Sequence, residues 1–260
     1  MSPAAHGALA GRHALVTGGG RGIGAAIAQA LAVEGATVTL LGRDTARLAA
    51  SAAALGGSAG YVAADVAKVP ELHAALAAAR ARAGEIAILV NNAGQALSAP
   101  LARTTPAELE RMLTVNFGGP FHCTQALLPA MLTAGFGRVV NVASTAGLKG
   151  YAYCTAYCAA KHALIGFTRA LALEVATRGV TVNAVCPGFT DTELTGATLA
   201  NIQHKTGRTA AQALAALVAH NPQQRLVTPA EVANAVLWLC LPGSDSITGQ
   251  SIAVAGGELG

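Results

Sequence analysis

The sequence predicts an α/β fold: one doubly wound domain in which a seven-stranded parallel sheet carries helices on both faces. Short β-branched apolar runs alternate with longer alanine- and leucine-rich segments of helical pattern. The runs are apolar throughout, as in strands that are buried on both sides, and strands joined by crossover helices pair in parallel. With 260 residues, 53% of them hydrophobic, the chain can bury one large core.

The expected elements follow one another without a Pro/Ser-rich linker, so residues 1–260 are expected to form a single domain. Right-handed crossovers would place the carboxyl ends of the strands, and a ligand crevice, on one edge of the sheet. The expected strands are His13–Thr17, Thr37–Leu41, Gly60–Ala64, Ile86–Val90, Arg138–Val142, Val180–Val185 and Ser251–Val254. The expected helices are about residues 22–34, 44–55, 70–83, 106–134, 157–177 and 229–240.

Composition excludes several classes of protein. Only 12% of residues are charged, the net charge is +4 without a run of like charges, and the pI is near 8.9, so we expect no nucleic-acid partner. Five cysteines without a CxxC pair suggest neither a disulfide framework nor a zinc site, and therefore no metal. The N-terminal Met-Ser-Pro-Ala-Ala-His is not a secretory signal, and no apolar stretch is long enough to span a membrane. We therefore expect a cytoplasmic protein with no membrane partner.

Residues 191–225 interrupt the alternation with a polar insertion between two prolines. Insertions of this length in a compact domain are usually binding loops or lids. Helices are expected inside it, because 210–219 is strongly helical in composition. We expect a mobile cover over the crevice, with an inert surface excursion as the alternative.

A glycine-rich segment, Thr17-Gly-Gly-Gly-Arg-Gly-Ile-Gly24, joins the first expected strand to the first helix. Its glycines let the backbone turn tightly and approach a pyrophosphate without a Cβ clash. The free N–H groups of the helix N-terminus favour the same phosphates; a simple tight turn is the alternative. The expected dinucleotide contacts here are Gly18, Arg21, Gly22, Ile23 and Gly24.

The end of the second strand indicates which dinucleotide binds. An acidic residue there would bind the ribose 2′-hydroxyl of NAD and repel a 2′-phosphate. This chain has Gly42 followed by Arg43, and a guanidinium can hold a phosphate by two hydrogen bonds, with Arg21 able to reach the same phosphate. We expect NADP; NAD is the alternative if Arg43 only stacks on adenine or pairs with Asp44.

Three further strand ends carry residues suited to the rest of a dinucleotide. A carboxylate after the third strand can bind the adenine amino group, and small residues after the fourth let the backbone pass the ribose, although Asn91 there can instead tie strands together. Groups after the sixth strand can pair with the nicotinamide carboxamide and a phosphate. The expected contacts are Asp65, Val66, Asn92, Ala93, Gly94, Pro187, Gly188, Thr190 and Thr192.

Ser144, Tyr157 and Lys161 predict the chemistry. Reduction of a carbonyl needs a proton donor beside the oxygen, and a nearby ammonium lowers the ordinary tyrosine pKa of about 10. Tyr157 and Lys161 are four residues apart and so share one face of a helix. Lys161 can also hold the nicotinamide ribose, and Ser144 would bind the substrate oxygen. Asn116 can bend its long helix and hold a water that extends a proton relay.

In combination, these motifs resemble the short-chain dehydrogenase/reductase family over about residues 10–257. The resemblance implies a Rossmann-like single domain and hydride transfer with Tyr157 as acid and base. It implies a catalytic tetrad of Asn116, Ser144, Tyr157 and Lys161, with Tyr157 and Lys161 also touching the cofactor. It further implies a homotetramer whose interfaces are the helices 106–134 and 157–177 and the last strand.

Within that family, residues 157–168 and 182–189 look like those of 3-oxoacyl-thioester reductases and 3-hydroxyacyl-CoA dehydrogenases, including polyketide ketoreductases. We expect an NADP-dependent oxidoreductase for such a small-molecule thioester, carried by coenzyme A or an acyl carrier. The alternatives are a dehydrogenase of a non-thioester secondary alcohol or ketone (cyclic, aromatic, hydroxy acid or steroid) and a cofactor-sensing protein without turnover. His204, Lys205 and Arg208 are expected either to meet a carrier phosphate or to form a solvated polar face.

Overall fold

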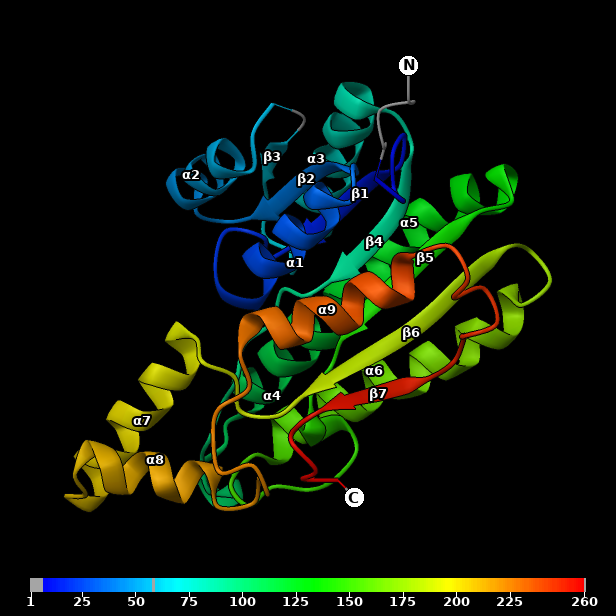
Figure 1. Ribbon diagram of the computed structural model, residues 1–260. Helices are drawn as coiled ribbons and strands as arrows, with labels where there is room; N and C mark the ends of the chain where they lie inside the picture. Colours follow the sequence, from blue (N-terminus) through cyan, green and yellow to red (C-terminus); the bar gives the residue numbers. More distant parts are fainter. Residues whose placement is uncertain (1–6, 58, 260) are drawn as a thin grey trace.

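The computed structural model describes residues 7–57 and 59–259 of the chain (Figure 1). The expectation about the first six residues lies outside this part. The strands are β1 (His13–Thr17), β2 (Thr37–Gly42), β3 (Gly60–Ala63), β4 (Ile86–Asn91), β5 (Gly137–Val142), β6 (Val180–Pro187) and β7 (Ser251–Val254). The helices are α1 (Gly22–Val33), α2 (Thr45–Leu55), α3 (Val69–Ala83), α4 (Pro106–Leu113), α5 (Gly119–Ala134), α6 (Thr155–Val175), α7 (Glu193–Thr206), α8 (Ala210–Val218) and α9 (Pro229–Cys240).

The strands form one seven-stranded sheet in the order β3-β2-β1-β4-β5-β6-β7, and every pair is parallel. This confirms the predicted fold class. The order reverses between β1 and β4, which are neighbours in the sheet. The crevice of an open α/β sheet lies at the carboxyl ends of the strands beside such a reversal, so the loops after β1 and β4 are at the centre of the expected site.

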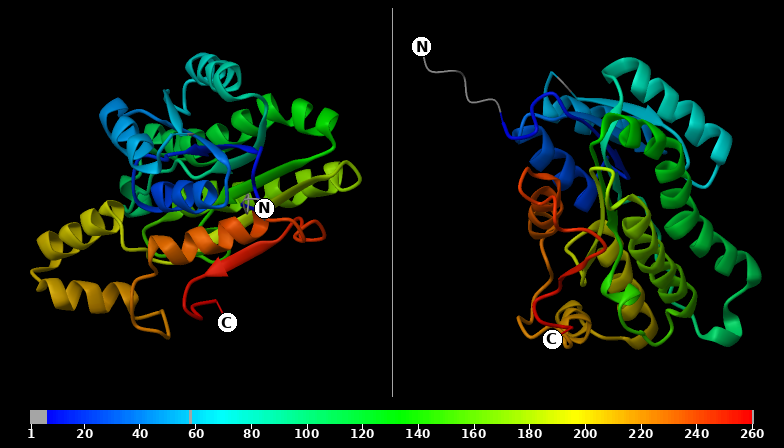
Figure 2. Two further views of the ribbon diagram at one scale, coloured as in Figure 1. Left: turned by 45° about the horizontal axis from the view of Figure 1, so that its top comes forward. Right: turned by 90° about the vertical axis from the view of Figure 1, so that its right-hand side faces the viewer.

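Two apolar cores explain why the strands lack polar alternation. One lies between the sheet and α1, α2 and α9, and the other between the sheet and α3, α5 and α6. The right-hand view of Figure 2 shows the two helical layers on opposite faces of the sheet. Each central strand therefore buries both of its faces, and β1, β5 and β6 are buried along their whole length.

The single helix expected over 106–134 is interrupted. A π-helical turn, η2 (Thr114–Gly118), separates α4 from α5. Pro120 explains the interruption, because it has no N–H to donate to the carbonyl of Asn116 four residues earlier. The irregular turn lies at Asn116, where a bend was expected from the sequence.

The polar insertion folds into α7 and α8, which confirms the expected helix over 210–219. Both helices extend away from the sheet, and their connection forms the outer tip of this projection (Figures 1 and 2). In the part of the chain that the structure describes, no helix combines the length and apolarity needed to cross a bilayer.

Candidate active site

Most of the predicted cofactor residues and Ser144 follow the carboxyl ends of the strands, whereas Asn116 lies in a π-helical turn and Tyr157 and Lys161 lie in α6. The glycine segment follows β1, Arg43 follows β2, and Asp65 follows β3. The Asn92–Gly94 segment follows β4, and Ser144 comes two residues after β5. Because parallel strands end at one edge, the sheet brings residues that are up to about 170 positions apart into a single crevice.

The glycine loop after β1 is too tightly packed for side chains at two positions. An ideal Cβ on Gly24 would lie 2.2 Å from the carbonyl oxygen of Gly18, and one on Gly18 would lie 2.9 Å from Asn92 Nδ2. Gly18 also has a left-handed φ of +66°. This closed turn brings the backbone N–H groups that begin α1 to the surface of the crevice, which is the arrangement that a pyrophosphate requires.

The loops after β1 and β4 are joined by the side chains of Thr17 and Asn92. The Thr17 hydroxyl accepts hydrogen bonds from the backbone N–H groups of Asn92 and Ala93 at 2.9 and 3.0 Å. Asn92 Nδ2 donates to the carbonyl of Thr17 at 2.9 Å. The Asn92 amide thus has a structural role here, in addition to the cofactor contact expected from the sequence.

Asn91 belongs to a separate buried network, as its alternative interpretation suggested. It donates to Asn141 Oδ1 at 2.9 Å, and Asn141 donates to the Thr168 hydroxyl at 2.9 Å. These bonds link β4, β5 and α6 beneath the site. Each polar group is buried, so the network fixes α6 against the sheet at a defined height.

Three arginines follow the ends of β1 and β2: Arg21 in the glycine loop, Arg43 directly after β2, and Arg47 in the first turn of α2. Arg43 has a side chain 66% exposed, and its Nη1 lies 3.8 Å from Asp65 Oδ2. It does not pair with Asp44, which instead caps α2 by accepting from Arg47 N–H at 3.1 Å. Arg21 and Arg47 both pair with the Glu193 carboxylate at the start of α7.

Sequence reasoning did not identify Arg47 or Glu193. The available signal was that Arg47 lies in the first turn of α2, directly after the strand end that carries Arg43. Glu193 follows Thr192, whose Cγ2 would be 3.3 Å from a Cβ on Gly22. The start of α7 therefore lies on the glycine loop.

The remaining predicted cofactor residues occupy the walls of the crevice. Val66 is 6% exposed and packs against Gly119. Asp65 accepts a hydrogen bond from Ala67 N–H at 3.0 Å. Gly188 N–H donates to Val254 O at 3.1 Å, and Thr190 is buried.

Ser144, Tyr157 and Lys161 come together as predicted. Lys161 Nζ donates to the carbonyl of Val142, the last residue of β5, at 2.9 Å. It lies 5.8 Å from the centre of the Tyr157 ring, one helical turn away on α6. Ser144 Oγ accepts from Ala146 N–H at 3.1 Å, which holds the serine at the start of a short 3-10 turn.

Burial determines the protonation of both titrating groups. It raises the pKa of Tyr157 to about 12, although the Ser144 hydroxyl opposes this shift. It lowers the pKa of Lys161 to about 8. The sequence predicts a lowered tyrosine pKa, whereas the net shift in this structure is upward because desolvation is the largest influence. Tyr157 is therefore a neutral hydroxyl at neutral pH, which suits a proton donor.

Asn116 lies near Lys161, and both its amide oxygen and its amide nitrogen are hydrogen-bonded within the protein. Its Oδ1 accepts from Gln95 N–H at 3.2 Å, and its Nδ2 donates to the carbonyls of Gln95 and Met112, each at 3.0 Å. A Cβ on Gly94 would lie 2.9 Å from Asn116 Oδ1 and 3.7 Å from Lys161 Nζ. Any water in the predicted relay would therefore bind the backbone of Asn116 rather than its amide.

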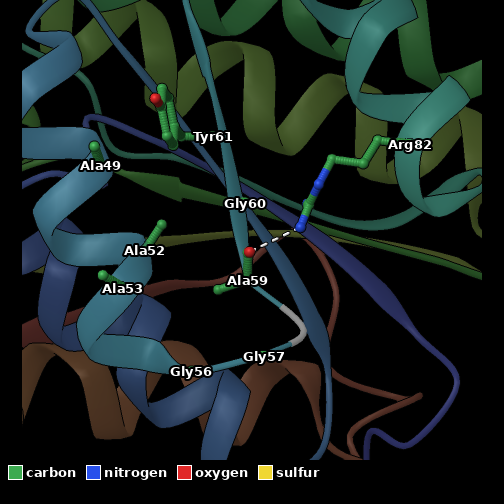
Figure 3. Close-up of a pocket in the computed structure, with 9 residues that line it drawn as sticks. All are labelled: Ala49, Ala52, Ala53, Gly56, Gly57, Ala59, Gly60, Tyr61 and Arg82. Atoms are coloured by element: carbon green, nitrogen blue, oxygen red, sulfur yellow. Dashed lines mark hydrogen bonds between the residues drawn. The ribbon is translucent and has the colours of Figure 1, made fainter.

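A depression elsewhere on the surface does not belong to this site. Its volume is about 570 Å³, and it lies between α2 and β3 at the edge of the sheet (Figure 3). Arg82 Nη2 donates to the carbonyl of Ala59 across it at 2.7 Å. None of its lining residues is a predicted site residue. Among the described residues, no group of histidine, cysteine or acidic side chains is arranged to hold a metal ion.

Known proteins share this fold and much of this sequence. The family model for short chain dehydrogenases matches residues 12–203. The 3-oxoacyl-[acyl-carrier-protein] reductase FabG of Vibrio harveyi is 39% identical over 249 residues, which cover 96% of this chain and 98% of that protein. The D-beta-hydroxybutyrate dehydrogenase of Cupriavidus necator is 37% identical over 253 residues, with 96% and 98% covered.

Among solved structures, an actinorhodin polyketide ketoreductase variant with NADPH aligns with a TM-score of 0.92 at 37% identity. The alignment covers 95% of this chain and 97% of that one. The fold, the matched length and the sequence identity all point to the same family. The chain belongs to the short-chain dehydrogenase/reductase family of oxidoreductases, enzymes that use an NAD(P) cofactor and act on CH–OH groups.

Proposed function

We propose that this enzyme uses NADPH to reduce a 3-oxoacyl thioester to the 3-hydroxyacyl thioester. The observation that carries the cofactor choice is the group of guanidiniums at the end of β2. Gly42 leaves no carboxylate to repel a 2′-phosphate, and Arg43 is exposed beside it. Arg21 and Arg47 lie close enough to share one carboxylate, so they can share a phosphate dianion in the same way.

The packing of the glycine loop also supports a dinucleotide. The Gly18–Gly24 turn leaves no room for a Cβ at two positions and aims the start of α1 outward. The remaining contacts would come from the loops after β3, β4 and β6. When bound, the reduced nicotinamide supplies the hydride, with its electron pair, to the keto carbon.

The chain's own residues supply the proton and the orientation. Tyr157 donates its hydroxyl proton to the developing alkoxide, a role that its high pKa permits. Ser144 binds the same oxygen and orients the carbonyl. The Lys161 ammonium, held at the end of β5, stabilises the resulting tyrosinate and binds the ribose. Asn116 fixes the loop after β4 and offers its backbone to a relay water.

The thioester substrate is proposed because a 3-oxoacyl-carrier reductase and a polyketide ketoreductase are both similar to this chain. His204, Lys205 and Arg208 are exposed near the outer tip of the α7–α8 projection. They would meet a carrier phosphate only if the substrate extends along that projection. A hydroxy acid is the second candidate, since a hydroxybutyrate dehydrogenase is similar over the same length.

The quaternary and cellular settings are also proposals. We propose a homotetramer of single-domain chains in which residues 191–225 form a lid. A cytoplasmic location accords with five free thiols. None of these proposals alters the chemistry at Tyr157.

The cofactor assignment is tested by Arg43→Ala. Removing a charged hydrogen-bonding group from the 2′-phosphate should lower kcat/KM for NADPH by roughly 10- to 100-fold, and change kcat/KM for NADH by less than about twofold. Steady-state rates with each cofactor measure this split. Arg80→Ala, which removes an exposed guanidinium on α3, is the matched control. Equal losses with both cofactors would contradict the assignment.

The substrate assignment is tested by NADPH oxidation with acetoacetyl-CoA and with ethyl acetoacetate as a matched small ketone. Turnover of the thioester alone supports the proposal. Replacing Lys205 and Arg208 together by alanine should then lower kcat/KM for acetoacetyl-CoA and leave kcat/KM for the small ketone unchanged. Turnover of the small ketone alone would favour the second candidate. Faster oxidation of NADH than of NADPH would favour the other cofactor.

A further inference from the structure

A buried carboxylate lies beside the Ser144 segment and has none of the roles described above. Glu258 follows the last strand, and its side chain is only 3% exposed. Gly256 and Gly257 have φ values of +61° and +93°, a left-handed pair that turns the chain back toward the site. Glu258 thereby reaches the loop after β6, where a Cβ on Gly188 would lie 3.2 Å from Oε2.

Two side chains from the segment after Ser144 contact this carboxylate, and a third is linked to it through one of them. The Tyr151 hydroxyl donates to Glu258 Oε1 at 2.5 Å, and Lys149 Nζ lies 3.0 Å from the same oxygen. The hydroxyls of Thr145 and Tyr151 are 2.7 Å apart. Since the single Tyr151 proton goes to the carboxylate, Thr145 must donate to Tyr151. Burial, and then the bond to Glu258, raise the pKa of Tyr151 and keep it a donor.

The contacts anchor the stretch of chain that separates two groups of the active site. Ser144 begins a short 3-10 turn, and Tyr157 lies in the first turn of α6. Tyr151 lies between them, and its ring packs edge-on against Phe189 at a centroid distance of 6.3 Å. Without an anchor, a loop of this length would let the two hydroxyls vary in separation, and a misplacement of about 1 Å can cost about 100-fold in rate.

We propose that Glu258 is a positioning residue for the reduction: through Tyr151 and Thr145 it fixes the segment that carries Ser144 relative to α6. The proposal rests on the roles given above to Ser144 and Tyr157. A buried carboxylate is a poor source of stability compared with a well-packed apolar residue, because its desolvation is costly. One carboxylate oxygen accepts from two donors of the same segment and so fixes their positions. An apolar residue could not supply this directional contact.

Two substitutions test the link from its opposite ends. Glu258→Gln keeps the shape of the side chain but removes the charge that holds Lys149, and Tyr151→Phe removes the bridging hydroxyl. With the full chain and saturating cofactor, each should lower kcat for ketone reduction about tenfold. The cofactor Kd and the Tm should stay near those of the wild type. Because both break one link, the double variant should be no slower than the slower single variant.

An isotope effect separates positioning from loss of folded protein. Cofactor deuterated at the transferred hydrogen should give a larger kinetic isotope effect on kcat in both variants, because hydride transfer becomes more rate-limiting. A smaller fraction of active enzyme would lower kcat and leave the isotope effect unchanged. Glu71→Gln, which removes an exposed carboxylate paired with Lys68 on α3, should change neither quantity.

The proposal is overturned if both variants keep kcat within twofold of the wild type, if their losses multiply in the double variant, or if kcat falls at a constant isotope effect. Ser144→Ala and Tyr157→Phe distinguish the two levels of failure. If these leave turnover intact, the proposed catalytic roles fail first. If they abolish turnover while Glu258→Gln does not reduce it, only the role of Glu258 fails.

Discussion

Tyr157 and Lys161 lie one helical turn apart, and burial shifts both toward their neutral forms. The pKa of Tyr157 rises to about 12 and that of Lys161 falls to about 8. At pH 7 the tyrosine is protonated and the lysine is mostly charged, so donor and cation are both present for reduction. The lysine is the group whose charge changes just above neutral pH.

The pH dependence of reduction should therefore follow Lys161. A lowered pKa means that the ammonium is present below about pH 8 and is lost as the pH rises through that value. We expect kcat/KM for ketone reduction at saturating cofactor, which reports the enzyme–cofactor complex, to change little from pH 6 to 7 and to fall as the pH rises through about 8. Rates at saturating cofactor measure the profile, and enzyme returned from pH 9.5 to pH 7 controls for inactivation. A flat profile through pH 9.5 would contradict the assignment.

The cofactor residues and Ser144 could be proposed from the sequence because they follow strand ends, where each has a chemical requirement of its own. Tyr157 and Lys161 share a helix face by spacing alone. The engaged amide of Asn116 was not predictable, since its partner Gln95 lies 21 positions earlier on another loop. The tyrosine pKa was mispredicted because the depth of burial depends on packing that spacing does not reveal.

At the scale of elements, α7 is tied to the glycine loop by charge. Glu193 Oε1 lies 2.8 Å from Arg47 Nη1, and the same carboxylate pairs with Arg21. The bond to Arg47 lowers the pKa of Glu193, so the carboxylate stays ionised. Exposed ion pairs such as these contribute only about 0–1 kcal/mol each, so a dianion can displace the carboxylate. In the proposed complex with NADPH, the start of α7 and the 2′-phosphate would therefore compete for the same arginines.

Glu193→Gln should consequently favour NADPH. Removal of the carboxylate frees two guanidiniums, and we expect the Kd of NADPH to fall roughly 2- to 10-fold while that of NADH stays constant. Fluorescence titration with each cofactor, and with adenosine 2′,5′-bisphosphate, measures the split. Glu85→Gln, which removes an exposed carboxylate paired with Arg80, is the control. An equal change for both cofactors would mean that Glu193 acts on the lid alone.

The alternation of strands and helices was predictable because the central strands are buried on both faces and so are apolar throughout. Interruptions within elements were harder to predict. The π-helical turn depends on Pro120, a local signal, and the sequence analysis located the bend but not its type. The pairing of Glu193 with Arg47 joins residues 146 positions apart, for which no local pattern exists.

For the whole molecule, the topology explains why so few residues suffice for the site. The sheet order reverses at β1 and β4, and the buried Asn91–Asn141–Thr168 network fixes α6 against the adjoining strands. The loops after β1 and β4 and the helix α6 are therefore held in place by the same central strands of the sheet. The parts outside that centre, α7, α8 and the turn that carries Glu258, are the parts whose roles the sequence left open.

The proposed homotetramer makes a prediction about the outer face of α6. Leu173 is 82% exposed there, and the proposed interface along α6 would cover it with a second copy. Leu173→Glu would place a charge inside that contact at a cost of several kcal/mol, so light scattering should show a species smaller than four chains of 25.8 kDa. Val33→Glu, at a side chain 69% exposed at the end of α1, should leave the wild-type mass unchanged. A wild-type monomer would contradict the tetramer, and a tetrameric Leu173→Glu variant would exclude this face of α6 from the interface.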